Sequence, residues 1–300
     1  MISATTSHPS AGFGLAAASA GFFACMDVAV RYCAPYLNLW QIIFGRSLLG
    51  LAAMVLLARL LRLDLFGRQR KTLLLAGLAG GIGVICLTAA LLLLPLFQAL
   101  VLLYLYPLFA AAIAPLITGD RFRRGDWFAL TCGLAGTVLV LWPAGGPAGR
   151  FSLGHLLGLT AAGCYALAMN LIRRTVNHSG PLAPLFYITA VAGLACAFPA
   201  VLTPLPQGTL FAEGLLALGA LTLFGLLAYL TSNLALGRLP APTVGVIAML
   251  EVVFSALLGL FLFHETLSVT ALLGGAVILA SGLFLTLKPT RPPLQVPTQG

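Results

Sequence analysis

Charged residues are scarce in this chain of 300 residues. Only 8% of the positions carry Asp, Glu, Lys or Arg, against a hydrophobic share of 60% and a mean hydropathy of +1.06. A soluble domain needs a polar and charged surface, which this composition cannot supply. The chain is therefore expected to lie within a lipid bilayer.

The sequence also lacks the motifs of metal, nucleotide and nucleic-acid chemistry. It has four histidines without an H-E-x-x-H pair, and it has no G-x-x-x-x-G-K-[ST] element. Its six cysteines form no C-x-x-C pair, which favours small core residues over metal ligands. The net charge of +9 comes from basic residues in short loops rather than one stripe. We expect no cofactor, no metal site, no nucleic-acid partner and no enzyme activity.

Long apolar runs are what the chain has in abundance. Each is long enough to cross a hydrocarbon layer of roughly 30 Å as a helix rising 1.5 Å per residue. The runs predict an all-α membrane protein with ten transmembrane helices near residues 13–33, 38–58, 72–94, 97–117, 127–142, 154–172, 183–202, 214–236, 242–263 and 269–287.

Basic residues are distributed very unequally between the two sides of the membrane. If the N-terminus is cytoplasmic, the outer segments hold Arg150 alone. The cytoplasmic segments then hold Arg59, Arg62, Arg68, Arg70, Lys71, Arg121, Arg123, Arg124, Arg173, Arg174, Arg238, Lys288 and Arg291. The positive-inside rule thus predicts a bacterial inner-membrane protein with both termini in the cytoplasm.

The chain repeats itself at a spacing near 145 residues. Segment 94–120 aligns without gaps to 239–265; both open with Leu-Pro and close on an acid. Likewise 23–31 lies over 166–174, which matches Asp27 to Asn170 and Arg31 to Arg174. Because each copy has five spans, the second must enter the membrane from the opposite side, giving an inverted-topology repeat with a substrate site between the halves. The expected parts are a cytoplasmic tail (1–12), a first five-helix repeat (13–142), an outer linker (143–153), a second five-helix repeat (154–287) and a cytoplasmic tail (288–300).

Several stretches resemble the drug/metabolite transporter superfamily, specifically its EamA type. They are LNLWQIIFGRSLLG, LYLYPLFAAAIAPLITGD, and MLEVVFSALLGLFLFHETLSVTALLGGAVILASG, which opens with a Leu-Glu-Pro-Val-like start. The resemblance covers nearly all of residues 12–288 and implies a carrier of small organic metabolites, often amino acids, with a central cavity lined by both halves. The chain departs from the pattern at Val252, where proline is usual, so a weaker kink is expected there.

Few ionisable groups fall inside the predicted spans, and each costs about 2.5–3.5 kcal/mol at a helix centre unless it has a partner or water. Glu251 lies about 14 Å into the ninth span, near the midplane. It is either a site for a substrate amine or a proton, or an acid that holds helices together. Asp27 and Arg31 share a helix face at the favourable spacing for an ion pair. Arg46 lies at roughly the depth of Asp27, so a contact between the first two helices would let Asp27 serve both arginines.

Tyrosine and asparagine side chains are the other candidates for a cavity wall. They are Tyr104, Tyr106, Asn170, Tyr165, Tyr229 and Asn233. Tyr229 and Asn233 share one face of the eighth span, and Asn170 is the repeat counterpart of Asp27. The alternative is that the aromatic residues are packing or membrane-interface residues.

These features favour a secondary active transporter that works by alternating access. An acid and a base in the membrane favour export of amino acids or amino-acid-derived zwitterions, including metallophore-like metabolites. The alternative is import of a cofactor-like metabolite such as S-adenosylmethionine or riboflavin, because MDVAVRY and WQIIFGRS also resemble carriers of that kind. A channel is disfavoured because the chain has one midplane acid rather than a ring of charges, and an intramembrane enzyme because no nucleophile with a base is found. The expected partners are lipid, a small-molecule substrate and protons as coupling ion; a monomer and a homodimer both stay open.

Overall fold

The computed structural model describes residues 9–62, 64–118, 124–141, 152–175, 180, 182–204, 209–239 and 241–287. All regular structure in these residues is helical, which confirms the all-α class. Within them, eight helices are long and apolar enough to cross a membrane, and two shorter apolar helices lie at Trp127–Val140 and Val269–Phe284. The count of ten spans stays a prediction.

The helices follow the predicted spans with bounds shifted by a few residues. Those of the first half are α1 (Pro9–Cys33), α2 (Leu39–Leu61), α3 (Arg70–Leu93), α4 (Leu96–Leu103), α5 (Tyr106–Thr118) and α6 (Arg124–Leu141). Those of the second half are α7 (Leu153–Thr175), α8 (Ala183–Leu202), α9 (Thr209–Leu236), α10 (Ala241–Ala248), α11 (Leu250–Phe263) and α12 (Val269–Thr286). The fourth and ninth predicted spans are therefore each divided into two helices.

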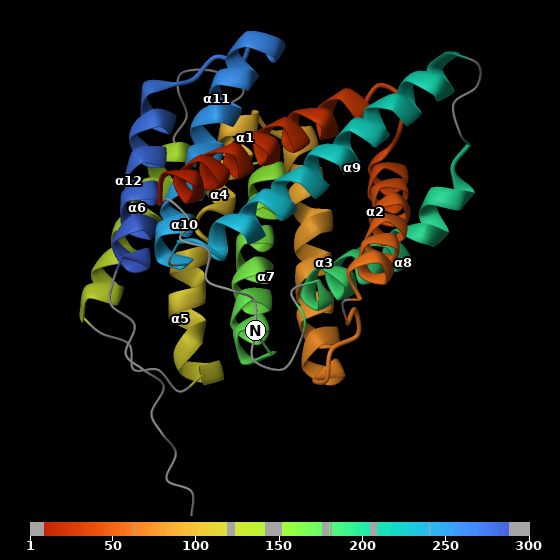
Figure 1. Ribbon diagram of the computed structural model, residues 1–300. Coiled ribbons are helices and arrows are strands. Elements are labelled where there is room, and N and C mark those ends of the chain that lie inside the picture. The colour runs from red at the N-terminus through yellow and green to blue at the C-terminus, as the bar shows by residue number, and fades with distance from the viewer. Residues whose placement is uncertain are drawn as a thin grey trace, which may run out of the picture.

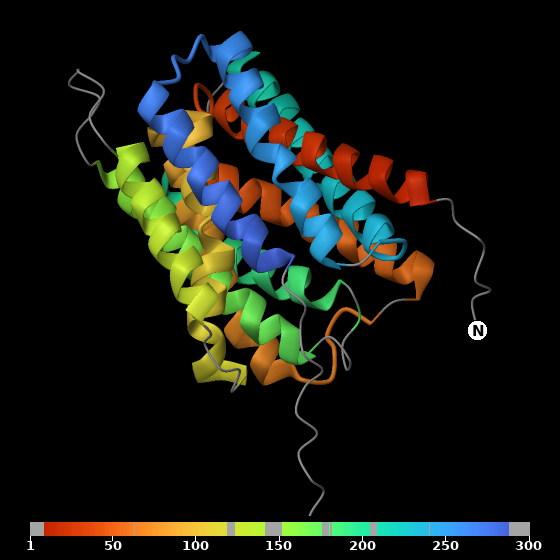
Figure 2. The same ribbon diagram turned by 90° about the vertical axis from the view of Figure 1, so that its left-hand side faces the viewer.

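Helix packing between the halves comes in matched pairs. If α1, α2 and α3 correspond to α7, α8 and α9, then the packing of α1 on α9 has its mate in α7 on α3. In the same way α2 on α9 matches α8 on α3, and α1 on α11 matches α7 on α5. Figures 1 and 2 show α1 and α9 running side by side, and Figure 2 shows α6 beside α12. This exchange of partners supports a two-fold relation between the halves; their opposite orientation in the membrane stays a prediction.

The break between α4 and α5 follows from a proline. Pro107 has no N–H to donate to the carbonyl of Leu103, and its ring would clash with that carbonyl in a continuous helix. The helix accordingly ends at Leu103, and a new helix starts at Tyr106, where proline is accepted in the first turn. Tyr104 caps the end of α4.

The break between α10 and α11 occurs without a proline; the expectation of a weaker kink at Val252 stays a prediction. The carbonyl of Ala248 accepts a hydrogen bond of 2.6 Å from the hydroxyl of Tyr104 instead of one from within its own helix. The amide of Val252 turns to the carbonyl of Met249, at 3.2 Å. A side chain that enters the hydrogen-bond ladder is a known cause of a helix break. Tyr104 therefore connects the two breaks: it ends α4 and its hydroxyl binds the carbonyl at the end of α10.

Close helix crossings depend on glycine, as between α6 and α12. A Cβ atom built on Gly274 would lie 2.5 Å from the carbonyl oxygen of Gly136, and one on Gly136 would lie 2.8 Å from that of Gly274. Small residues let helix backbones approach closely in membranes, where lipid offers no hydrophobic drive for association.

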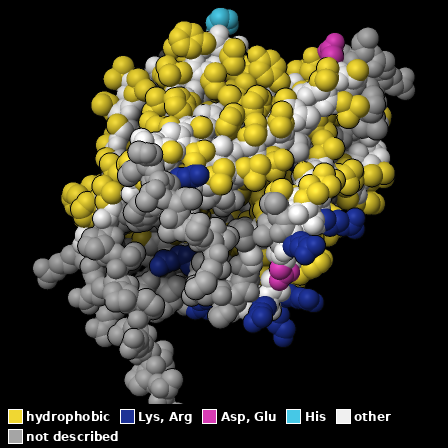
Figure 3. Space-filling model, in the orientation of Figure 1, with side chains coloured by type: hydrophobic (Ala, Val, Ile, Leu, Met, Phe, Trp, Pro, Cys, Tyr) yellow, Lys and Arg dark blue, Asp and Glu magenta, His cyan; other side chains and the backbone are white. Residues whose placement is uncertain are grey.

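Exposed basic side chains gather at one end of the bundle. Figure 3 shows hydrophobic side chains over the upper part of the visible face, and several Lys and Arg side chains at its lower right. Exposed basic residues of this end lie where α2 leads into α3, namely Arg59, Arg62, Arg68, Arg70 and Lys71. The opposite end holds the C-terminus of α1, the turn between α3 and α4, and the C-terminus of α11 (Figure 1).

Candidate functional site

Two acids meet in the interior where α1 packs against α11. Asp27 is 1% exposed and Glu251 8% exposed, and their carboxyl groups are in hydrogen-bonding contact. The Oδ2 atom of Asp27 is buried and has no hydrogen-bond partner within the described residues. The sequence placed both acids inside the membrane but gave no reason to pair them.

Tyr104 joins this acid pair to the helix breaks. Its hydroxyl lies 3.1 Å from Oε2 of Glu251 as well as 2.6 Å from the carbonyl oxygen of Ala248. Its ring lies 6.0 Å from that of Tyr106, which is itself within electrostatic range of Glu251. Glu251 is thus held at the point where the backbone of both broken spans is interrupted.

Arg46 supplies a positive charge on the same side. It is half-buried on α2, and its Nη2 atom lies 3.9 Å from Sδ of Met26, the neighbour of Asp27 on α1. Its charge acts on Asp27, Tyr165 and Tyr229. The guanidinium therefore faces the interior of the bundle rather than the lipid headgroups.

Tyr165 and Tyr229 complete the group, which we call the central polar cluster: Asp27, Arg46, Tyr104, Tyr106, Tyr165, Tyr229 and Glu251. The ring of Tyr165 lies against Gly83 of α3, where an added Cβ would come within 3.1 Å of it. Tyr229 packs edge-on to Phe23, with ring centroids 5.7 Å apart, and remains 38% exposed. Tyr229 is thus the partly exposed member of a cluster whose two acids are buried.

The expected ion pair between Asp27 and Arg31 is wrong. Arg31 turns away from Asp27 and forms an ion pair with Glu265, beyond the end of α11. Among the described residues, no ion pair joins Asp27 to Arg46 either. The i, i+4 spacing allows a pair on α1, but Arg31 lies at the end of its helix, where the carbonyl groups of Leu91 and Leu94 and the carboxylate of Glu265 are its partners.

Two of the predicted residues lie apart from the cluster. The side-chain amide of Asn170 donates to the carbonyls of Ala110 and Ala166, both at 3.0 Å, so Asn170 packs α7 against α5. Asn233 is exposed on α9. The repeat matches Asn170 to Asp27, but the side-chain amide of Asn170 is bound to backbone carbonyls of α5 and α7 and does not reach the cluster.

Three features of the site were missed by sequence reasoning. They are the Met26 sulfur beside Arg46, the Ala248 carbonyl bonded to Tyr104, and Ser255, whose buried Oγ has no partner in the described part of the chain. Ser255 lies one turn beyond Glu251 and could have been found from that i, i+4 spacing. The carbonyl of Ala248 carried no signal in the sequence.

The cluster offers binding groups of both signs and no metal-binding set. The residues that the structure describes contain no group of three or more His, Cys, Asp or Glu side chains placed to hold a metal ion. An acid pair, a guanidinium and four phenol groups suit an organic molecule with charged and polar substituents.

Comparison with known proteins agrees with this arrangement. The sequence profile of the EamA-like transporter family matches residues 10–142 and 152–287, which together span nearly the whole described chain. The chain belongs to the EamA-like transporter family. It is therefore a multi-pass membrane transporter and not an enzyme, as the sequence predicts.

Relatives of this EamA-family chain include named transporters. The pseudopaline exporter CntI of Pseudomonas aeruginosa (strain UCBPP-PA14) is 27% identical over 92% of this chain and 95% of its own. An uncharacterized transporter of Archaeoglobus fulgidus is 29% identical over 72% of this chain and 77% of its own. A solved crystal structure superimposes with a TM-score of 0.60 at 20% identity, covering 92% of this chain and 96% of the other, which shows a shared fold.

Proposed function

We propose that this transporter exports amino acids or amino-acid-derived zwitterionic compounds, metallophore-like metabolites included, by alternating access. The observation that carries the proposal is the contact between the Asp27 and Glu251 carboxyl groups at the helix breaks, with the Arg46 guanidinium 3.9 Å from Sδ of Met26, the neighbour of Asp27. A zwitterion presents an ammonium group to the acids and a carboxylate to the arginine. A relative named as an exporter supports the direction.

Protons are the proposed coupling ion, and the number of hydrogens available to the hydrogen bonds around Tyr104 supports this. The hydroxyl of Tyr104 has one hydrogen, yet the oxygens of Ala248 and Glu251 both lie within hydrogen-bonding distance. If Glu251 carries a proton, it donates to Tyr104, which donates to Ala248. Two carboxyl groups in contact also require a shared proton, because two carboxylates would repel each other. Release of that proton to one side and uptake from the other is the coupling step that we propose.

Import of a cofactor-like metabolite such as S-adenosylmethionine or riboflavin is the alternative function. Four tyrosines in the central polar cluster support it, because aromatic rings stack on planar heterocycles. The two proposals differ in the ligand: a zwitterion needs Arg46 and the acids, whereas a flat heterocycle needs the rings.

We further propose that both termini face the bacterial cytoplasm and that the two halves are inverted. The end of the bundle with exposed Arg and Lys between α2 and α3 is then the cytoplasmic end. Reporter fusions after residue 66 and at the C-terminus should report cytoplasm, and one at residues 145–149 should report the outside. A C-terminus outside the cell would contradict both the ten-span count and the inverted repeat.

A transport assay in proteoliposomes tests the substrate. Purified protein is screened for uptake and competition with amino acids, zwitterionic amino-acid conjugates, S-adenosylmethionine and riboflavin, with and without a pH gradient. Saturable flux of a zwitterion, driven by the gradient and reduced in Arg46→Ala, is the expected result. Saturable flux of riboflavin or S-adenosylmethionine alone would favour the alternative, and flux without saturation would indicate a channel.

A further inference from the structure

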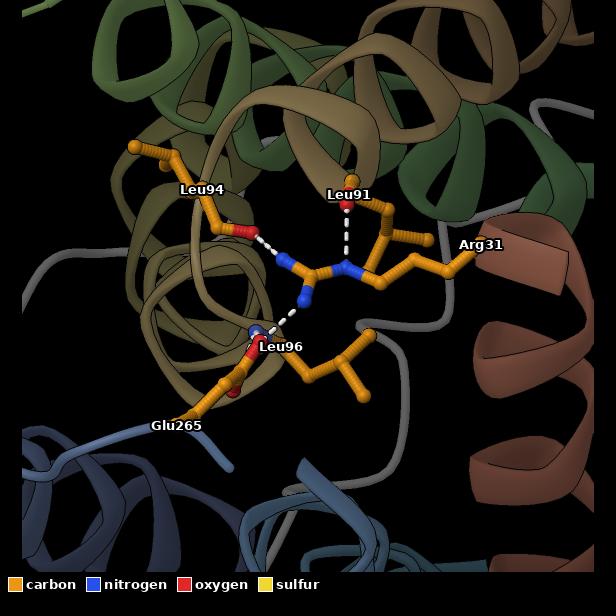
Figure 4. Close-up of polar contacts among 5 residues, drawn as sticks. All are labelled: Arg31, Leu91, Leu94, Leu96 and Glu265. Carbon is orange, nitrogen blue, oxygen red and sulfur yellow. Dashed lines mark hydrogen bonds and ion pairs between the residues drawn. The ribbon is translucent and has the colours of Figure 1, made fainter. Parts of the chain in front are cut away.

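A dense polar network of side chains and backbone joins α1, the turn between α3 and α4, and the segment after α11 (Figure 4). These segments lie at the end of the bundle opposite the exposed basic residues (Figure 1). Arg31, in the last turn of α1, donates from Nε to the carbonyl of Leu91 at 2.9 Å and from Nη2 to the carbonyl of Leu94. Its Nη1 atom is paired with Glu265, and its guanidinium lies over the ring of Phe263, 5.2 Å from the centroid. One side chain of the first half thereby contacts the end of α3 and the end of α11.

Glu265 completes the network by capping α4. Both of its carboxylate oxygens accept from the amide of Leu96, at 3.1 and 3.0 Å, in the first turn of α4. A carboxylate at a helix N-terminus satisfies a free N–H and meets the positive end of the helix dipole. An acid of the second half therefore holds a helix of the first half.

The local backbone of α11 is shaped to present this acid. His264 has a left-handed conformation, with φ of 51°, which ends the helix and directs Glu265 back toward α11. Gly259 leaves the space that the carboxylate needs: a Cβ atom there would lie 2.5 Å from Oε2 of Glu265. The side chains of Arg31 and Glu265 are 18% and 9% exposed, so their charges are largely removed from water.

We propose that Arg31, Glu265 and the Leu96 amide form a latch that holds the outer end of the transporter closed. We call these groups the outer latch. It rests on the proposed function, in which substrate leaves through this end. The helix that it caps, α4, is almost wholly buried, as is expected where the bundle is sealed. For the outer end to open, α11 must move away from α1 and α4, and the outer latch must separate.

Cys33 provides a native reporter for that opening. It is 0% exposed, it lies two residues beyond Arg31 on α1, and its thiol is within electrostatic range of Arg46 of the central polar cluster. Cys33 is buried at the outer end of α1 while the outer latch is formed, so faster labelling of this thiol from outside reports that the packing held by the latch has opened. The measurement is labelling by a membrane-impermeant maleimide in right-side-out vesicles, read at the Cys33 peptide by mass spectrometry and normalised to the protein present in the membrane.

Glu265→Gln removes the charge but keeps the size of the side chain, and Arg31→Gln removes the other partner. Hydrogen bonds to charged groups are worth about 1.5–3 kcal/mol, so each variant should raise the labelling rate of Cys33 on the order of tenfold or more. The matched control is Arg174→Gln, the repeat counterpart of Arg31, which is exposed near the end of α7. It should leave labelling from outside unchanged. No rise in the two latch variants, or an equal rise in the control, overturns the proposal.

A second pair of variants keeps every charge. Gly259→Ala should displace the carboxylate of Glu265 and raise labelling of Cys33, whereas Gly219→Ala, whose Cβ would meet nothing within 4 Å, should not.

A charge exchange, Arg31→Glu with Glu265→Arg, is a third test and should fail to restore closure. The new arginine cannot accept from the Leu96 amide, and the new acid cannot donate to the carbonyls of Leu91 and Leu94. Restored closure in the exchanged protein would show a simple ion pair and contradict the latch.

The labelling assay needs no substrate, so its outcome is separate from that of the proposed function. If no zwitterion is transported but the latch variants expose Cys33, the substrate proposal fails and the outer latch stands. If zwitterions are transported and Cys33 labelling is unchanged, the outer latch fails and the substrate proposal stands.

Discussion

The helices α4 and α10 occupy matching places in the repeat, yet they are packed very differently. Each has eight residues and ends where its span is broken. In α4 the buried residues are Leu96, Phe97, Ala99, Leu100, Val101 and Leu102. In α10, over residues 243–248, Val244 alone is buried. The repeated sequence determines where a span breaks, but it does not determine how tightly each copy is packed.

This difference agrees with the alternating access that we propose for the two related halves. In an inverted repeat, α4 and α10 lie toward opposite faces of the membrane, and the halves exchange conformations during transport. With the orientation proposed above, a buried α4 under the outer latch and a partly buried α10 would correspond to a protein closed outside and looser inside. We expect the two helices to exchange their burial when the transporter turns over.

The two copies also differ in the residues that follow their breaks. By the spacing of 145 residues, Tyr106 corresponds to Glu251 and Tyr104 to Met249. The first half thus brings phenol groups to the position where the second half brings a carboxyl group. The hydrogen bond between Tyr104 and Glu251 forms only because the two halves carry different residues at these equivalent positions. Substitution of these residues is therefore the most direct test of the difference between the halves.

The largest effect is expected from Glu251→Gln. Glutamine keeps the size and a hydrogen-bonding capacity but cannot take up and release the proton. Accumulation of substrate driven by a pH gradient should fall on the order of tenfold or more, while exchange of substrate is retained. Both are measured side by side in proteoliposomes, with the exposed acid variant Glu213→Gln as the matched control. Unchanged gradient-driven accumulation in Glu251→Gln would rule out proton coupling at this residue.

A somewhat smaller loss is expected from Arg46→Ala. The variant removes the positive charge that faces Asp27, so transport of a zwitterion should fall about tenfold, the loss of about 1.4 kcal/mol of binding free energy. Arg46→Lys should restore transport in part, because an ammonium group lacks the planar fork of the guanidinium. Initial rates are compared at equal amounts of protein in the membrane. Near-normal transport by the alanine variant would assign Arg46 a packing role.

Tyr104→Phe should have an intermediate effect, because it removes the hydroxyl that holds both breaks. The carbonyl of Ala248 loses its partner, which should lower the free energy of unfolding by about 1–3 kcal/mol. Hydrogen exchange at the Val252 amide should slow if that amide then returns to Ala248 and α10 joins α11. The control is Tyr187→Phe, whose hydroxyl donates to the Phe66 carbonyl at an exposed position. Equal stability losses in both variants would show that the break does not depend on Tyr104.

The fold was more predictable than the contacts within it. Hydropathy and the repeat identified the helices, and Pro107 gives a visible reason for the first break. The second break depends on Tyr104, which is far from it in sequence, and no local pattern could have revealed it. The depth of Glu251 and Arg46 pointed to the interior, but the partner of Arg31 could not be deduced. The choice between Asp27 and Glu265 is made by how the ends of α1, α3 and α11 meet.

The smallest effect is expected from Val252→Pro. In an ordinary helix, proline removes a hydrogen bond to the carbonyl four residues earlier and clashes with it, at a cost of about 3 kcal/mol or more. Here that carbonyl belongs to Ala248 and is already bonded to Tyr104, and the Val252 amide makes only a bond of 3.2 Å to Met249. Proline should therefore lower the free energy of unfolding by only about 1 kcal/mol. Leu257→Pro, at an exposed position within α11, is the matched control and should show the full cost. Thermal unfolding in detergent compares the stability of the two variants. Equal losses of stability would mean that the Val252 amide is hydrogen-bonded to the Ala248 carbonyl as in an ordinary helix, so that α10 and α11 are not separated at this point.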